Sequence, residues 1–304
     1  MSRLFDILSR GSGEIADLVR PLGDVAPAQE APQAKMEPAG AAALAPAQSE
    51  VPPATASSGA AGTQFRTVSL RIPAPSPLLP FEGANHRPSE QYRILRTRIV
   101  QHPKQPRVIV VSSPAAGDGK SVNAVNIAAA LSLKSEAEVL LVDGDFRRSA
   151  IHTQLGIPES PGLAEVLRGT CGLEDAVVRT REFPHLFVLA AGALEGNPVE
   201  LLDSAPWRAL CARLREQFRY VIVDSPPVGA VADYDLIQAA CDGVILVIRP
   251  DHTDRTLCMK ALETVPKAKL LGVLLNCVPE WSLAKHAGSD YYYYAGAKPY
   301  KGKQ

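Results

Sequence analysis

The sequence predicts an α/β fold with a mostly parallel sheet covered by helices on both faces. A short apolar strand runs into a glycine-containing loop and then a helix, near residues 107–133. Two further apolar strands, near residues 139–142 and 220–223, end in aspartates. Strand and helix patterns then alternate toward residue 275, which is typical of a parallel sheet. The 304 residues suffice for one such domain plus additional segments.

The first of these segments, Arg107–Ser121, reads RVIVVSSPAAGDGKS. Val108–Val111 is expected to be a buried strand, and Ser121–Leu133 a helix that begins after Gly119-Lys120. In this context, free backbone N–H groups and the helix dipole attract phosphate, which favours a P-loop NTPase. Lys120 then supplies a charge to the phosphates and Ser121 an oxygen to Mg²⁺. The first glycine of the usual pattern is replaced by Pro114, and a helix-capping turn is the alternative.

Acidic residues follow the next two predicted strands. Asp143 and Asp145 come after Val139–Val142, and Asp224 comes after Tyr220–Val223. Ligands of open α/β sheets bind at the carboxyl ends of the strands. Asp143 and Asp145, two residues apart, are expected to point to the same side of an extended segment, as Mg²⁺ coordination or proton abstraction requires. A surface turn with an ion pair is the alternative.

The rest of the domain continues the alternation of strands and helices. An edge strand is expected within Phe65–Ile72. The further expected strands are Leu186–Ala190, Val244–Ile248 and Leu270–Leu275. The further expected helices are Leu163–Leu167, those within Pro198–Phe218, one beginning at Asp233, and Thr256–Val265.

A helix with two faces is predicted at Ser89–Val100. Tyr92, Leu95 and Ile99 form an apolar stripe, while Glu90, Arg93 and Arg96 form a charged stripe at three-residue steps. A solvated charged face is the simplest interpretation of the second stripe.

The two ends of the chain differ from this domain. Residues 1–20 predict a short amphipathic helix, and residues 21–63, rich in Ala and Pro, predict a disordered linker because they bury too little apolar surface. The domain is expected at 64–288. Residues 289–304 predict an exposed tail, for which an aggregation-prone run and a core strand are the alternatives. Its tyrosines are Tyr291, Tyr292, Tyr293, Tyr294 and Tyr300.

Bulk composition excludes several classes of protein. Lys plus Arg and Asp plus Glu each number 32, so the net charge gives no indication of nucleic acid as a partner. The five cysteines lack metal-binding spacing, which suits buried thiols in a reducing compartment. With no signal peptide and no apolar run of membrane-spanning length, a cytoplasmic protein is expected.

From about Phe65 onward the chain resembles the bacterial tyrosine kinases, or BY-kinases. Residues 116–121 (AGDGKS) match the family's Walker A form, residues 143–147 (DGDFR) its Walker A′ motif, and residues 221–227 (VIVDSPP) its Walker B motif. Residues 196–202 (GNPVELL) resemble its NP-x-E-L-L segment, and Glu90, Arg93 and Arg96 its E-x-x-R-x-x-R motif. The tyrosine tail corresponds to its autophosphorylation cluster. Residues 1–63 look like those of stand-alone members linked to exopolysaccharide loci, including exosortase-associated ones.

The resemblance implies an ATP- and Mg²⁺-dependent tyrosine autokinase that phosphorylates its tail in trans and regulates exopolysaccharide polymerisation and export. It implies that Asp145 and Asp224, with Ser121, hold the metal and that Asp143 is the base, with Lys120 also catalytic. Glu90, Arg93 and Arg96 would assemble a ring. The implied nucleotide-binding residues are Ala116, Gly117, Asp118, Gly119, Lys120, Ser121, Val122 and Asn276.

The implied partners are further copies of the chain, a membrane-embedded polysaccharide co-polymerase adaptor that recruits the kinase to the inner membrane, and a protein-tyrosine phosphatase. A switch ATPase of the partitioning and division-site type is the alternative, because it shares the fold. Such ATPases carry a signature lysine early in the P-loop, where this chain has Ala115, and they lack a tyrosine cluster. A non-enzymatic nucleotide-binding scaffold is disfavoured because the acidic positions are intact.

Overall fold

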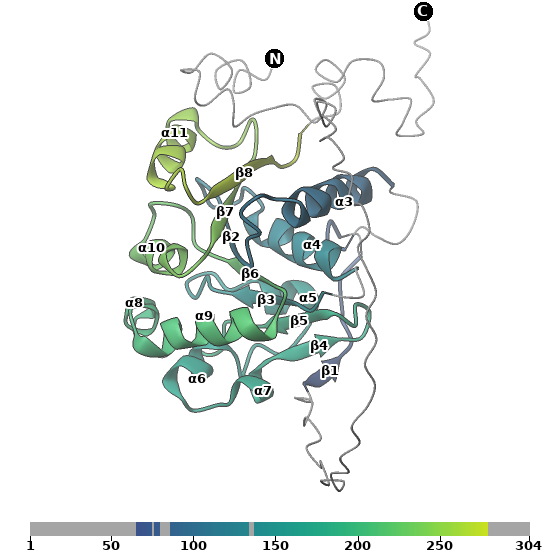
Figure 1. Ribbon diagram of the computed structural model, residues 1–304, viewed down its shortest axis with the longest axis vertical. Coiled ribbons are helices and arrows are strands. Elements are labelled where there is room, and N and C mark those ends of the chain that lie inside the picture. Colours follow the sequence, from purple (N-terminus) through teal and green to yellow (C-terminus); the bar gives the residue numbers. More distant parts are fainter. Residues whose placement is uncertain (1–64, 75, 80–85, 134–136, 279–304) are drawn as a thin grey trace, which may run out of the picture. The chain divides into compact units, whose positions relative to one another are not determined.

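The computed structural model describes residues 65–74, 76–79, 86–133 and 137–278. In this part of the chain an eight-stranded sheet has the strand order β1-β4-β5-β3-β6-β2-β7-β8 (Figure 1). The expected amphipathic helix at 1–20, the linker at 21–63 and the tail at 289–304 lie outside the described residues.

The strands and helices follow the chain in the order expected for alternating elements. The strands are β1 (Arg66–Val68), β2 (Val108–Ser112), β3 (Val139–Asp143), β4 (Val178–Thr180), β5 (Leu186–Leu189), β6 (Tyr220–Asp224), β7 (Gly243–Ile248) and β8 (Leu270–Leu275). The helices are α3 (His86–Val100), α4 (Lys120–Ser132), α5 (Ile151–Leu155), α6 (Leu163–Arg168), α7 (Leu173–Ala176), α8 (Pro198–Leu202), α9 (Ala205–Gln217), α10 (Ala232–Ala239) and α11 (Arg255–Thr264).

Six neighbouring strands, from β5 to β8 in the sheet order, pair in parallel. Strand β4 pairs antiparallel with β5, and the short edge strand β1 pairs in parallel with β4. The sheet is therefore mostly parallel, as the sequence predicts. The segment around Phe65–Ile72 does add an edge strand, although only three of its residues pair.

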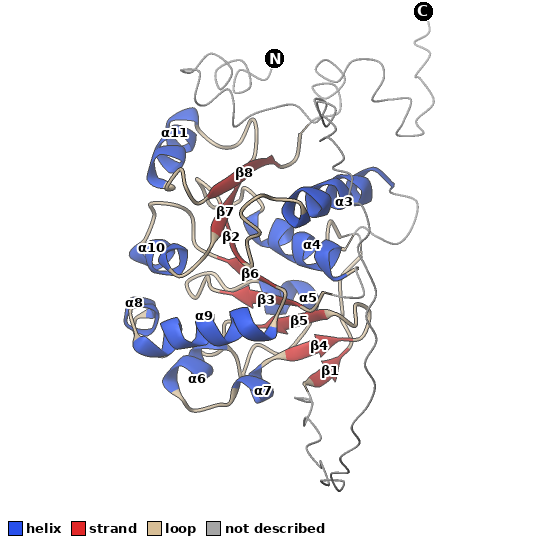
Figure 2. Cartoon of the chain, in the orientation of Figure 1, coloured by secondary structure: helices blue, strands red, loops and turns tan. Residues whose placement is uncertain are grey.

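Two apolar clusters fill the space between the sheet and its helices. Successive residues of a strand point to opposite faces, so Val108 and Val110 of β2 belong to one cluster and Ile109 and Val111 to the other. Helices α6 to α11 contribute to the first cluster, and α3, α4 and α5 to the second. Figure 2 shows the red strands between blue helices on both sides. Covering of both faces explains why these strands are continuous apolar runs.

Three short elements are absent from the sequence-based expectation: α5, α7 and β4. They have five, four and three residues. One helical turn, or three paired residues, is too short to produce a recognisable hydrophobic period. Helix α3 also begins earlier than expected, at His86 rather than Ser89.

Candidate active site

Three strands at the centre of the sheet bring the predicted site together. Strands β3, β6 and β2 are neighbours, and each reaches the same edge of the sheet with its carboxyl end. In the register, Asp143 pairs with Asp224, and Asp224 pairs with Val111 at the end of β2. The two aspartates of separate sequence motifs and the loop after β2 therefore share one edge, where ligands of such sheets bind.

The loop between β2 and α4 has the backbone of an anion-binding turn. Gly117 and Gly119 have φ angles of 89° and 93°, a left-handed region that side chains disfavour. A Cβ atom on Gly119 would lie 2.2 Å from Nδ2 of Asn276, so the close approach itself requires glycine. Helix α4 begins directly afterwards at Lys120.

Two asparagine side chains hold the carbonyl groups of this loop. Asn276 Nδ2 donates to the carbonyl oxygen of Asp118 at 2.8 Å, and Asn123 Nδ2 donates to that of Gly119 at 2.9 Å. In a trans peptide the N–H points away from the C=O. The N–H groups of Gly119 and Lys120 are thereby directed away from the two asparagines. For Asn276 this is a contact with the phosphate loop; the adenine contact implied by the resemblance stays a prediction.

The loop between β7 and α11 also contacts the P-loop, and the sequence alone gave no indication of this. Thr253 Oγ1 donates to Oδ1 of the buried Asp118 at 2.5 Å, and Asp118 Oδ2 accepts from the Ala115 N–H at 3.0 Å. The ring nitrogen Nε2 of His252 lies 3.4 Å from the carbonyl oxygen of Ala116. Asp118 is thus a buried anchor of the loop.

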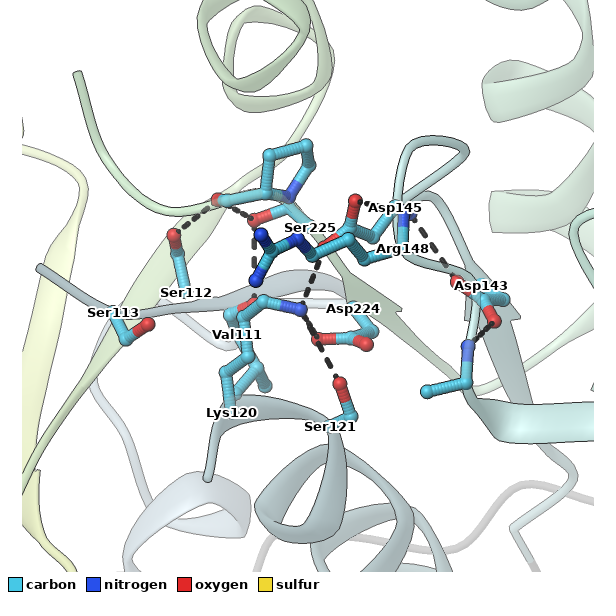
Figure 3. A network of polar contacts seen from close by, with 12 residues as sticks. Val111, Ser112, Ser113, Lys120, Ser121, Asp143, Asp145, Arg148, Asp224 and Ser225 are labelled. Atoms are coloured by element: carbon cyan, nitrogen blue, oxygen red, sulfur yellow. Dashed lines mark hydrogen bonds and ion pairs between the residues drawn. The ribbon is translucent and has the colours of Figure 1, made fainter. Parts of the chain in front are cut away.

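Lys120 is the cation of the acidic cluster. Its Nζ lies 2.8 Å from Oδ2 of Asp145, 3.5 Å from Oδ1 of Asp224 and 3.3 Å from Oγ of Ser121. Figure 3 shows the side chain reaching from the start of α4 toward these groups. Burial lowers the pKa of Lys120, but the negative charges of Asp224, Asp145 and Asp143 outweigh it, so the pKa lies above its ordinary value.

Asp143 lies apart from this contact, with its carboxylate against backbone N–H groups (Figure 3). Oδ1 accepts from the N–H of Asp145 at 3.2 Å, and Oδ2 accepts from those of Ala150 and Ile151 at 3.1 Å each. Strand β3 ends at Asp143, so Asp145 lies in the loop that follows. The expectation that Asp143 and Asp145 share one extended segment is therefore wrong, because the strand ends at Asp143.

Burial perturbs two of these acids strongly. Burial, followed by the charge of Asp224, raises the pKa of Asp143 to about 7, although the N–H groups of Ile151 and Ala150 oppose the shift. Burial also raises the pKa of Asp224 to about 6, against the lowering effect of Lys120. Both carboxyl groups therefore change protonation near neutral pH, as is common for groups that transfer protons or bind cations.

The donor set fits Mg²⁺. Apart from the ion pairs with Lys120, Oδ2 of Asp145 and both carboxylate oxygens of Asp224 are buried with no hydrogen bond recorded among the described residues. Among these residues, Lys120 forms the ion pairs of the two carboxylates, and one ammonium leaves them with an excess of negative charge. No three His, Cys, Asp or Glu side chains of the described ranges form a complete metal site. That agrees with Mg²⁺, which binds one or two carboxylates together with substrate phosphates.

The other predicted residues divide into those at the site and those away from it. Ser121 and Val122 open α4, while Ala116 and Gly117 lie on the exposed side of the loop. Glu90 and Arg93 form an ion pair at 3.3 Å on α3, and both side chains are exposed. The phosphoacceptor tyrosines lie outside the described residues.

A second contact that the sequence did not predict supports the Walker A′ segment. Arg147 donates to both carboxylate oxygens of the fully buried Asp233, at 2.7 and 3.1 Å. Asp233 lies in the first turn of α10, which follows the Walker B strand. The fork therefore ties the two acidic segments together.

Comparisons with known proteins identify the family of this chain. The family model described as an AAA domain matches residues 106–269. "Tyrosine-protein kinase YwqD" of Bacillus subtilis (strain 168) is 36% identical over 208 residues, covering 67% of this chain and 86% of the relative. "Tyrosine-protein kinase CpsD" of Streptococcus pneumoniae serotype 4 is 35% identical over 193 residues, covering 62% and 83%.

A solved structure shows the same similarity in three dimensions. "Crystal structure of the chimerical protein CapA2B2" has a TM-score of 0.64 and 32% identity, covering 70% of this chain and 93% of that one. The kinase names of the relatives decide against the switch-ATPase alternative. By sequence, by fold and by the chemistry at the sheet edge, this chain belongs to the bacterial tyrosine kinase family.

Proposed function

We propose that this kinase uses ATP and Mg²⁺ to phosphorylate the tyrosine cluster of a neighbouring copy: Tyr291, Tyr292, Tyr293, Tyr294 and Tyr300. The observation that carries the proposal is the buried contact of Lys120 with Asp145 and Asp224 beside the phosphate loop. The names of the relatives support a tyrosine as the acceptor.

Each residue of the site has a distinct task in this proposal. The N–H groups of Gly119 and Lys120 and the ammonium of Lys120 bind the phosphates of ATP. Ser121, Asp145 and Asp224 hold Mg²⁺, which when bound neutralises charge on the transferring phosphate. Asp143 takes the proton of the tyrosine hydroxyl. Its pKa of about 7 suits a base at neutral pH, and its three N–H contacts keep the carboxylate in place.

The length of the tail permits transfer within a copy or between copies. From Asn276 to Tyr291 the chain has 15 residues by its numbering, which extend to about 50 Å at most. We propose transfer between copies because Glu90, Arg93 and Arg96 fall on the assembly motif of the resemblance. Glu90 and Arg93 are exposed on α3, where a second copy can reach them.

We further propose that the kinase acts in the cytoplasm and regulates exopolysaccharide or capsule polymerisation and export. A membrane-embedded adaptor would recruit it, and a tyrosine phosphatase would reset it. Among the helices of the described residues, none has the length and hydropathy of a membrane span. The solved structure of the chimerical protein CapA2B2 supports a kinase that pairs with a second protein.

A mixing experiment tests transfer between copies. A Lys120→Met protein with its tail is incubated with active protein that lacks residues 291–304, labelled ATP and Mg²⁺. We expect phosphotyrosine on the tail of the Lys120→Met protein, as located by peptide mapping. Wild-type protein alone is the control. If wild type is labelled but the Lys120→Met protein in the mixture is not, transfer in trans is ruled out. If wild type itself is not labelled, the autokinase activity is rejected.

A further inference from the structure

A chain of hydrogen bonds connects helix α3 with the phosphate loop. Tyr92 Oη of α3 donates to Oδ1 of Asn123 on α4 at 2.9 Å. Nδ2 of the same Asn123 donates to the carbonyl oxygen of Gly119 at 2.9 Å. The phenol, the carboxamide and the loop carbonyl therefore form one continuous path from α3 to the loop.

The path defines the orientation of the Asn123 side chain. A carboxamide has an acceptor end and a donor end, and here Tyr92 binds the acceptor end while Gly119 binds the donor end. Asn123 is 1% exposed, so water does not replace either partner. Without the phenol hydroxyl, the buried Oδ1 of Asn123 would lose its donor. The carboxamide would then have a weaker preference for the orientation in which Nδ2 donates to the Gly119 carbonyl.

Tyr92 is itself fixed by a second asparagine. Asn126 Nδ2 donates to Tyr92 Oη at 3.1 Å and to the carbonyl oxygen of Pro77 at 3.0 Å, while Asn126 Oδ1 accepts from the Leu79 N–H at 2.7 Å. The tyrosine ring packs against the apolar cluster between α3, α4 and the sheet. The hydroxyl thus has a defined position from which to orient Asn123.

We propose that Tyr92 is a positioning residue for nucleotide binding: through Asn123 it holds the Gly119 carbonyl so that the Lys120 N–H faces the phosphates. The proposal rests on the proposed function only in that the loop binds ATP. It adds that the position of α3, which carries Glu90 and Arg93 on its exposed face, affects the geometry of the nucleotide site. A contact that shifts α3 would then alter the loop, although α3 itself touches no phosphate.

The test is Tyr92→Phe in the full chain, with binding of Mg²⁺–ATP measured by titration calorimetry. The ring and its packing remain, and only the hydroxyl is lost. We expect the dissociation constant to rise by about threefold to tenfold, the range that one neutral hydrogen bond covers.

Tyr234→Phe is the matched control. Tyr234 on α10 is 0% exposed, and its hydroxyl has no hydrogen-bond partner among the described residues. Both variants keep the ring and remove one hydroxyl, but only the hydroxyl of Tyr92 has hydrogen-bond partners, so the difference between the two variants reports the loss of those bonds. We expect an unchanged dissociation constant for Tyr234→Phe, and denaturant unfolding shows that each variant is folded.

A double variant tests the path through Asn123. If Tyr92 acts through this residue, Tyr92→Phe should add nothing to the weaker binding of Asn123→Ala. Equal affinity of Tyr92→Phe and wild type, or full additivity in the double variant, would overturn the inference and leave the kinase assignment intact. A wild type that binds no Mg²⁺–ATP would overturn both.

Discussion

Asp143 and Asp224 stand directly opposite each other in adjacent parallel strands, and both side chains are completely buried. Their pKa values, raised chiefly by burial to about 7 and about 6, make stability depend on pH. The unfolded chain releases these protons near pH 4, whereas the native state keeps them to higher pH. Between about pH 4 and 7 the native state therefore binds more protons, and stability falls as pH rises.

We expect Asp143→Asn to remove part of this slope. The free energy of unfolding is measured with urea in the absence of Mg²⁺. As pH rises from about 4 to 7, it should fall less for the variant than for wild type. A parallel pair of pH profiles would contradict the raised pKa.

Asp242→Asn is the control of opposite sign. Burial raises the pKa of Asp242, but hydrogen bonds from the N–H groups of Val108 and Arg107 and the charge of Arg215 outweigh burial. The pKa of Asp242 therefore lies below its ordinary value. Its stabilisation is therefore lost only as pH falls below about 4.

Replacing Lys120 by Met should abolish phosphotyrosine formation while the fold persists. The substitution removes the ammonium that contacts Asp145 and Asp224 and that is placed to bind phosphate. The loss of one preorganised charge from a phosphoryl-transfer site costs about a hundredfold or more in rate. Activity is measured with anti-phosphotyrosine detection and the fold by circular dichroism. A folded variant with wild-type phosphorylation would remove Lys120 from the site.

Replacing Thr253 by Val should loosen the phosphate loop from the opposite side. Valine keeps the shape but leaves Oδ1 of the buried Asp118 without its 2.5 Å donor. We expect a loss of about 1–3 kcal/mol in the free energy of unfolding, together with weaker Mg²⁺–ATP binding. Thr253→Ser keeps the hydroxyl and is the matched control. Wild-type stability and affinity in the valine variant, or a larger loss in the serine variant, which lacks only the methyl group, would contradict the role of the hydrogen bond.

The sheet and the core of the site were predictable from sequence because their signals are local. Val108–Val111 leads into Gly119-Lys120, and two apolar strands end in Asp143 and Asp224, so the apolar runs and the chain order place them at one edge. Parallel pairing then brings them together without any knowledge of side-chain contacts.

The contacts that support the site were not predictable in this way. Thr253 reaches Asp118 across 135 positions of sequence, and Arg147 reaches Asp233 across 86. Neither threonine nor arginine carries a periodic signal, and each partner is chosen by the packing of whole elements. The same holds for Tyr92, which the helical period places correctly on an apolar stripe. Its ring packs there as expected, but the period gives no information on where its hydroxyl points.

The charged stripe of α3 should control self-association. Replacing Glu90, Arg93 and Arg96 together by Ala leaves the apolar stripe of the helix on its own domain, so the fold should persist. We expect light scattering to show a smaller species than wild type, with tail phosphorylation reduced in parallel. Arg208→Ala, on the exposed surface of α9, is the control for loss of a surface charge. An unchanged oligomer, or a monomer for both proteins, would reject the assembly role.

Phosphorylation of the tail should dissolve the oligomer. Each phosphotyrosine adds about −1.5 to −2 charges at neutral pH, so five would add roughly −7 to −10. The nearby positive charges are Lys298, Lys301 and Lys303. Tails gathered in one assembly would then repel one another, and a phosphorylated tail would be repelled by the acidic cluster of Asp143, Asp145 and Asp224.

We expect light scattering at low salt, where screening is weakest, to show smaller particles for phosphorylated protein than for phosphatase-treated protein. Protein that lacks residues 291–304 should stay assembled under both treatments, since it has no tail to charge. Fully phosphorylated protein that remains oligomeric at low salt would exclude charge repulsion as the switch.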